Sequence, residues 1–117
     1  MEYMLLIYHS EADSKKMSRA QHGEIFQEYQ TFTQDLTKSG KNKSGAPLEQ
    51  STTATTVRVR NGKTVVTDGP FAETKEQLGG FYLIEAKNLD EAIEIASRIP
   101  SARVGSIEVR PIMKMNM

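Results

Sequence analysis

The spacing of hydrophobic and polar positions changes along the first 40 residues, and each spacing predicts a different element. Residues 3–8 form a short apolar run of strand-forming side chains, which predicts a strand buried on both faces. Residues 10–16 are polar and are expected to form a surface loop. Ser18 and Gln21 then match a helix capping box, and a helix is expected to end at Gly40. Its apolar stripe at helical spacing is His22, Ile25, Phe26, Tyr29, Phe32 and Leu36.

The middle of the chain predicts a loop followed by a hairpin. Residues 40–51 are rich in Gly, Ser and Lys and are expected to form a loop. Two β-prone runs, residues 52–59 and 63–67, flank Asn61 and Gly62. An Asn-Gly pair between such runs is the strongest short hairpin signal, because both turn residues must accept positive φ.

The last third of the chain completes an α+β pattern. A strand is expected at residues 80–86, then a helix that Asp90 caps and Pro100 stops, then a strand at residues 106–110. The order strand, helix, hairpin, strand, helix, strand predicts a ferredoxin-like sandwich with both helices on one face of an antiparallel sheet. Two of these strands are apolar on both parities, but two helices cover only one face. We therefore expect a second copy of the chain to cover the other face, as a homodimer.

Composition narrows the function classes. The 117 residues fit one domain, and 15 basic residues balance 15 acidic ones, so nothing indicates a nucleic-acid partner. The absence of cysteine excludes disulfides and thiolate metal sites, and two histidines are too few for a multi-histidine site, so no metal or cofactor is expected. No apolar run is long enough to span a membrane and no secretory signal is visible, so a cytoplasmic protein is expected. The Met-rich residues 113–117 predict a frayed or partner-packed tail, with a soft-metal site as the alternative.

The densest cluster of functional side chains lies in residues 68–80, a connection too long for a tight hairpin. In the functional interpretation, Asp68, Glu73, Lys75 and Glu76 lie at the rim of a cleft, where they bind a polar ligand or move protons. In the structural alternative, the segment is a capped turn with a packed Phe71.

Two histidines and three tyrosines are further candidates. His22 is expected in the first turn of the long helix, where the helix dipole favours a neutral imidazole that could act as a base; the alternative is a packed core residue. His9, at the end of the first strand, could reach a cleft, or it is a half-exposed strand terminus. With Tyr8, Tyr29 and Tyr82 these residues could form an aromatic and polar pocket, although aromatic side chains at such positions are usually core.

Residues 68–76, with the sequence DGPFAETKE, resemble the signature of the DGPF proteins within the YCII-related superfamily. The resemblance implies one YCII-related (DGPF) domain over residues 1–117 and a dimeric α+β barrel built from ferredoxin-like units. YCII relatives carry a proposed His–Asp pair that suggests an enzymatic role, and bacterial DGPF proteins are often encoded near or fused to extracytoplasmic-function sigma factors. The family implies no settled reaction. The resemblance extends to residues 3–8, 53–60, 78–86, 89–100 and 108–111.

Two functions follow as hypotheses. The first is a homodimeric, cofactor-independent enzyme or binder of an unknown small molecule, with its site near residues 68–71. Its candidate catalytic residues are Asp68 and His22, and its candidate ligand-binding residues are His9, Tyr29, Glu73 and Lys75. The second is a noncatalytic interaction module associated with sigma-factor regulation. A pocket lined by Asp68 and a histidine favours the first, and a solid interior with an exposed apolar patch favours the second.

Overall fold

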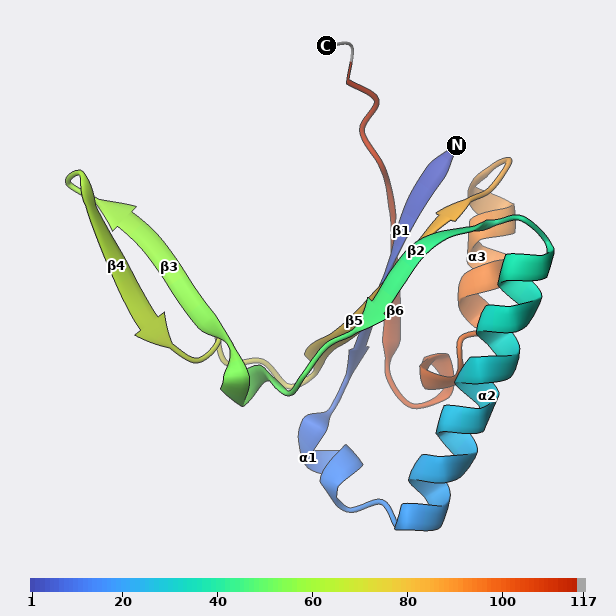
Figure 1. The fold of residues 1–117 in the computed structure, drawn as a ribbon, viewed down its shortest axis with the longest axis horizontal. Helices are drawn as coiled ribbons and strands as arrows, with labels where there is room; N and C mark the ends of the chain where they lie inside the picture. The colour runs from blue at the N-terminus through green and yellow to red at the C-terminus, as the bar shows by residue number, and fades with distance from the viewer. Residues whose placement is uncertain (116–117) are drawn as a thin grey trace.

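A four-stranded antiparallel sheet with two helices on one face forms the body of the protein (Figure 1). The computed structural model describes residues 1–115. The strand order is β2 (Asn42–Pro47), β5 (Gln77–Glu85), β1 (Glu2–His9) and β6 (Ser106–Pro111). Helix α2 (Arg19–Lys38) connects β1 to β2, and helix α3 (Leu89–Ser97) lies between β5 and β6. This is an α+β fold, and the two helices on one face of the antiparallel sheet fit the expected ferredoxin-like sandwich, but the predicted hairpin lies outside that sheet.

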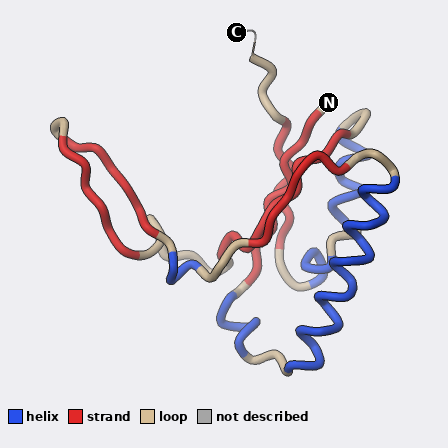
Figure 2. Tube along the Cα trace, in the orientation of Figure 1, coloured by secondary structure: helices blue, strands red, loops and turns tan. Residues whose placement is uncertain are grey.

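A second, two-stranded sheet projects from the body as an arm (Figures 1 and 2). It consists of β3 (Thr55–Arg60) and β4 (Lys63–Asp68), which pair only with each other in the sheet topology. The arm lies on the side of the main sheet away from α2 and α3. The radius of gyration is 16.3 Å, whereas a compact chain of this length has about 13 Å. The remaining short elements are α1 (Glu11–Lys15) and the 3₁₀ turns η1 (Ser51–Thr53) and η2 (Pro100–Arg103).

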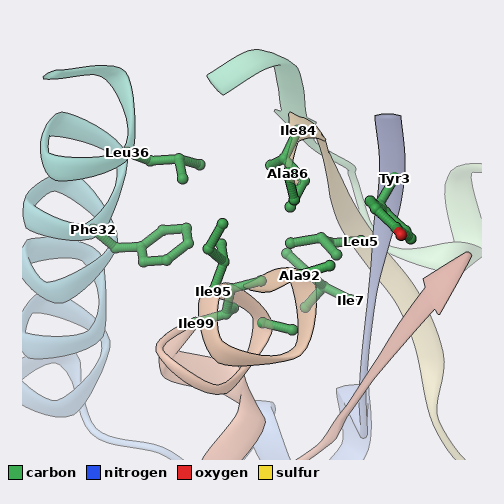
Figure 3. Close-up of a cluster of buried hydrophobic side chains, with 11 residues drawn as sticks. Tyr3, Leu5, Ile7, Phe32, Leu36, Ile84, Ala86, Ala92, Ile95 and Ile99 are labelled. Atoms are coloured by element: carbon green, nitrogen blue, oxygen red, sulfur yellow. The ribbon is translucent and has the colours of Figure 1, made fainter. Parts of the chain in front are cut away.

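The core fills the space between the sheet and the two helices (Figure 3). Side chains alternate in β1, so that Leu5 is buried toward the helices while Leu6 is half-buried on the opposite face. The first strand is therefore not buried on both faces within one chain. Phe32 from α2 meets Tyr82 from β5 edge to face, with ring centroids 5.2 Å apart. The buried cluster consists of Tyr3, Leu5, Ile7, Phe32, Leu36, Ile84, Ala86, Ala92, Ile95, Ala96 and Ile99.

Several local predictions are confirmed by backbone geometry. The reciprocal hydrogen bonds of the capping box join Ser18 and Gln21, which satisfies backbone donors at the start of α2. Gly40 follows the end of α2 with φ +76°, the left-handed conformation that ends many helices. Asn61 and Gly62, with φ of 53° and 75°, turn the arm as a hairpin whose two central residues have positive φ.

Three local predictions were wrong. Residues 40–51 are not only a loop, because they contain β2, a polar edge strand whose pairing with β5 its composition does not reveal. Residues 10–16 contain α1, whose backbone is capped by the Ser10 side chain accepting a hydrogen bond from the Asp13 N–H. Helix α3 is capped by Asn88 rather than Asp90, because the Asn88 side chain accepts from the Glu91 N–H.

The apolar stripe of α2 is narrower than its spacing predicts. His22 is exposed, so it is not a packed core histidine, and only Phe32 and Leu36 of this helix are buried. The first turns of α2 extend past the end of the sheet (Figure 1), which leaves them without a facing layer. In the C-terminal tail, Met113 and Met115 are exposed, and the rest of the predicted Met-rich tail, residues 116–117, lies outside the described residues.

Candidate functional site

The signature segment, residues 68–76, runs from the arm to the sheet. Asp68 is exposed at the end of β4, and Glu73 and Lys75 are exposed in the connection to β5. The Phe71 side chain is 79% exposed. The structural alternative, a turn with a packed Phe71, is therefore not found within one chain. Glu76 ends the segment at the sheet, where its carboxylate accepts a hydrogen bond from the Ser106 hydroxyl at 2.9 Å.

The candidates on α2 lie on the helix side of the sheet, away from the arm (Figure 1). The Tyr29 hydroxyl is 2.6 Å from the Ser101 hydroxyl of η2. Burial raises the pKa of Tyr29 and outweighs the hydrogen bond from Ser101, so this phenol stays neutral at physiological pH. One chain therefore does not bring Tyr29 or His22 together with Asp68, and their roles in a common site stay predictions.

The three tyrosines do not form one pocket within a chain. The Tyr82 hydroxyl is 2.6 Å from the Thr33 hydroxyl on the helix side of the sheet. Tyr8 lies on the opposite face, where its hydroxyl donates to the Glu108 carboxylate at 3.5 Å, and Glu108 pairs with Leu6 in the sheet. The sheet itself therefore separates Tyr8 from Tyr82.

A small polar pocket surrounds His9, where β1 ends and β5 begins. Its volume is about 110 Å³. A Cβ atom added to Gly79 would overlap the His9 imidazole, so the bare glycine backbone is what lets the ring lie against β5. His9 is half-buried, and it is the one predicted site residue that lines this pocket. The pocket is lined by His9, Glu11, Ser14, Leu48, Glu49, Gln50 and Gly79.

Glu11 connects this pocket to the base of the arm. Its two carboxylate oxygens accept hydrogen bonds from the Ser51 hydroxyl at 2.6 Å and the Ser51 N–H at 2.7 Å. Its own N–H donates to the Gln77 side chain at 2.9 Å, and Gln77 follows the signature segment directly. Both connections of the arm to the body, through η1 and through the start of β5, are therefore held by one residue.

Chemically, the pocket offers one imidazole and two carboxylates around a space for a small molecule. Imidazole and carboxylate side chains are the commonest general acids and bases in enzymes. The volume is below the roughly 300 Å³ at which drug-sized pockets begin, so only a small ligand fits. Sequence reasoning did not find Glu11, Glu49 or Gln77. The S-x-x-D spacing of Ser10 and Asp13 is a capping signal that indicates α1, and hence that Glu11 is held close to the end of β1.

The hydrogen bonds of the Glu11 carboxylate with Ser51, which anchor the arm to the body, are expected to weaken in acid. Burial acts to raise the pKa of Glu11, but the hydrogen bonds from Ser51 and the charges of His9 and Lys15 outweigh it and hold the pKa below its usual value. Because the folded pKa is the lower one, the carboxylate stabilises the fold above the unfolded value of about 4.3, and this contribution is lost as the pH falls through the folded pKa. We expect Glu11→Gln to lower Tm at pH 7, and the Tm difference from the unmodified chain to narrow below about pH 4.3.

Melting curves between neutral and acidic pH check this expectation. Glu24→Gln, at an exposed carboxylate of α2, is the matched control and should leave Tm nearly unchanged at each pH. A Tm difference for Glu11→Gln that is absent at pH 7 contradicts the anchor.

A wider, open groove of about 580 Å³ lies between α2 and the end of α3. It is lined mainly by polar side chains, among them Glu24, Glu28, Asp35 and Arg98. Glu28 is engaged by Arg103 at 2.7 Å, which lowers the pKa of Glu28 and joins α2 to η2. Within residues 1–115, no three His, Asp or Glu side chains are grouped so that they could hold a metal ion. No helix in that range is long and apolar enough to cross a membrane.

Two comparisons with known proteins give similar sequences. The family model of the YCII-related domain matches residues 1–116. An uncharacterized protein of Rhizobium meliloti (strain 1021) is 40% identical over 114 residues, which cover 96% of this chain and 92% of that protein.

Proposed function

The chain belongs to the YCII-related family, and we propose that it works as a homodimer that binds a small polar molecule at the His9 pocket. The observation that carries the ligand site is the pocket itself, which combines an imidazole, carboxylates and a hydroxyl beside a glycine whose missing side chain leaves room for the ring. If the bound molecule is also converted, His9 is the proposed general acid or base, in a reaction without a cofactor. The pocket lies beside the end of the signature segment, through Gln77 and Glu11.

The homodimer is supported by the uncovered face of the main sheet. Met4 and Leu83 pair across β1 and β5, and Leu6 and Phe81 form the next pair on the same face. All four side chains are only half-buried, and both long helices lie on the other face (Figure 1). A patch of half-buried apolar side chains on a sheet face normally packs on another layer, and a second copy supplies one by face-to-face packing about a two-fold axis. We call this surface, Met4, Leu6, Phe81 and Leu83, the outer face.

The ligand class follows from the charges around the pocket. Glu11 and Glu49 place two carboxylates at its lining, against one imidazole. Such a lining favours a small hydrogen-bond donor, an amine in particular, because carboxylates are acceptors and gain most from a charged donor.

Thermal shift measurements with sets of small amines, carboxylic acids and polyols test the proposal. We expect at least one amine to raise Tm in a concentration-dependent way, and Gly79→Ala to abolish the rise, because the added methyl group displaces the His9 ring. Gly23→Ala is the matched control, since a methyl group there meets open space, and it should retain the shift. No shift with any set, or an unchanged shift in a folded Gly79→Ala variant, contradicts this site.

A second candidate function is the noncatalytic interaction module associated with extracytoplasmic-function sigma factors. The exposed valines of the arm favour it, because a soluble chain seldom leaves such a patch without a partner. Asp68 then acts as part of a docking surface rather than as a proton carrier. Both candidate functions assume a cytoplasmic protein, as the sequence leads us to expect.

A further inference from the structure

The two faces of the arm differ in chemistry. The register pairs Val57 with Val66 and Val59 with Thr64, which places these four β-branched side chains on one face. The other face carries Arg58, Arg60 and Lys63 around Val65. We call these the valine face and the basic face. The valine face is the more exposed one, with Val57 at 60%, Val59 at 61% and Val66 at 61% exposure, against 43% for Val65.

A hairpin surrounded by water is expected to expose its charged face and to cover its apolar face, whereas in this arm the valines of the valine face are the more exposed. A two-stranded sheet alone in water is marginally stable, and it usually requires a further layer against its apolar face. Within residues 1–115 the arm has no such layer, because it projects from the body and forms a separate sheet (Figure 2). The valine face carries no basic side chain, so a polyanion such as nucleic acid or an acidic membrane would select the opposite, basic face.

The position of the arm favours a second copy of the chain as the occupant of the valine face. The arm leaves the body on the side of the outer face, away from both long helices (Figure 1). A second copy that covers the outer face must therefore lie in the angle between the main sheet and the arm. By two-fold symmetry each copy then offers its arm to the other, so the contact forms twice.

We propose that the valine face of each arm packs on the second copy and clasps it. This inference rests on the proposed homodimer and extends it from the outer face to the arm. Asp68 lies in the same alternation as Val66, so the docking face includes the first residue of the signature segment. No hydrogen bond or ion pair of the Asp68 carboxylate occurs within residues 1–115 of a single chain. In the clasp, the Asp68 carboxylate lies at the boundary between the two copies, where residues of the second copy surround it.

Thiol reactivity at single introduced cysteines tests the clasp, because the chain has no cysteine of its own. We compare Val57→Cys on the valine face with Val65→Cys on the basic face, using an aromatic disulfide reagent, and follow the dimer fraction by sedimentation over a dilution series. We expect the Val57→Cys thiol to react about tenfold more slowly in the dimer than in the monomer, and the Val65→Cys thiol to change less than about twofold.

The outcomes separate the two proposals. A Val57→Cys rate that falls as the dimer fraction rises supports the clasp. A dimer whose assembly leaves the Val57→Cys rate unchanged overturns the clasp and leaves the homodimer standing. A chain that stays monomeric at every concentration overturns the homodimer and the clasp together. If the dimer persists at the lowest concentration, the reaction rates of the two thiols in the dimer are compared. In one chain Val57 is more exposed than Val65, so the clasp predicts a slower rate for Val57→Cys than for Val65→Cys. A Val57→Cys thiol as reactive as the Val65→Cys thiol contradicts the clasp.

Discussion

Gly105→Ala is expected to lower the free energy of unfolding by at least about 3 kcal/mol, the upper end of the usual cost of overpacking. A Cβ atom at Gly105 would overlap the Tyr8 carbonyl oxygen and lie 3.2 Å from the His9 Cα. Both are backbone atoms of β1, so no side-chain rotation relieves the overlap, and the start of β6 must move away from β1. Urea denaturation of the purified variant measures the change through its midpoint.

Gly23→Ala is the matched control for this substitution. A methyl group at Gly23 meets no atom within 4 Å, and Gly23 lies inside α2, where alanine is favoured over glycine by about 0.5–1 kcal/mol. The same chemical change is therefore expected to stabilise one site and destabilise the other. A Gly105→Ala midpoint equal to that of the unmodified chain contradicts the close approach of β6 to β1.

Leu83→Lys is expected to weaken the dimer about 100-fold, which corresponds to roughly 2.7 kcal/mol. Leu83 lies at the outer face, so in the proposed dimer its side chain faces the second copy. A lysine there brings an unpaired charge from each copy into an apolar interface, which costs more than the lost apolar contact. Sedimentation velocity over a concentration series gives the dissociation constant.

Ile93→Lys serves as the control for Leu83→Lys. Ile93 is an exposed side chain of similar size on α3, which lies on the opposite face of the sheet. The same charge is therefore added outside the proposed interface, and the dissociation constant should stay within about twofold. If both substitutions weaken the dimer equally, the dimer interface does not lie at the outer face.

Much of the fold is predictable from sequence because local signals agree with tertiary packing. Ser18 and Gln21 predict the start of α2, and the Asn61-Gly62 pair predicts the hairpin of the arm, because capping and turn geometry depend on neighbouring residues alone. Strand β2 is different, because its polar residues carry no apolar alternation. Its place as an edge strand depends on hydrogen bonds to β5, which no local pattern encodes.

The candidate site is predictable only in part for the same reason. His9 was found because it ends an apolar strand, but its neighbours arrive through contacts distant in sequence, such as Glu11 with Ser51 and Gln77. The sequence groups Asp68 with His22, whereas Asp68 ends β4 and His22 lies in α2, and the arm and α2 lie on different sides of the main sheet (Figure 1). Which face of a sheet a residue joins depends on register and bulges, and a bulge does interrupt the pairing of β1 with β5.

The outer face connects the proposed homodimer with the proposed clasp, since the dimer covers it and the arm extends beyond it. Sedimentation equilibrium of the unmodified chain tests this point most directly. The account predicts a species of twice 13.1 kDa that persists as the chain is diluted into the micromolar range. A folded species of 13.1 kDa at high protein concentration would contradict it.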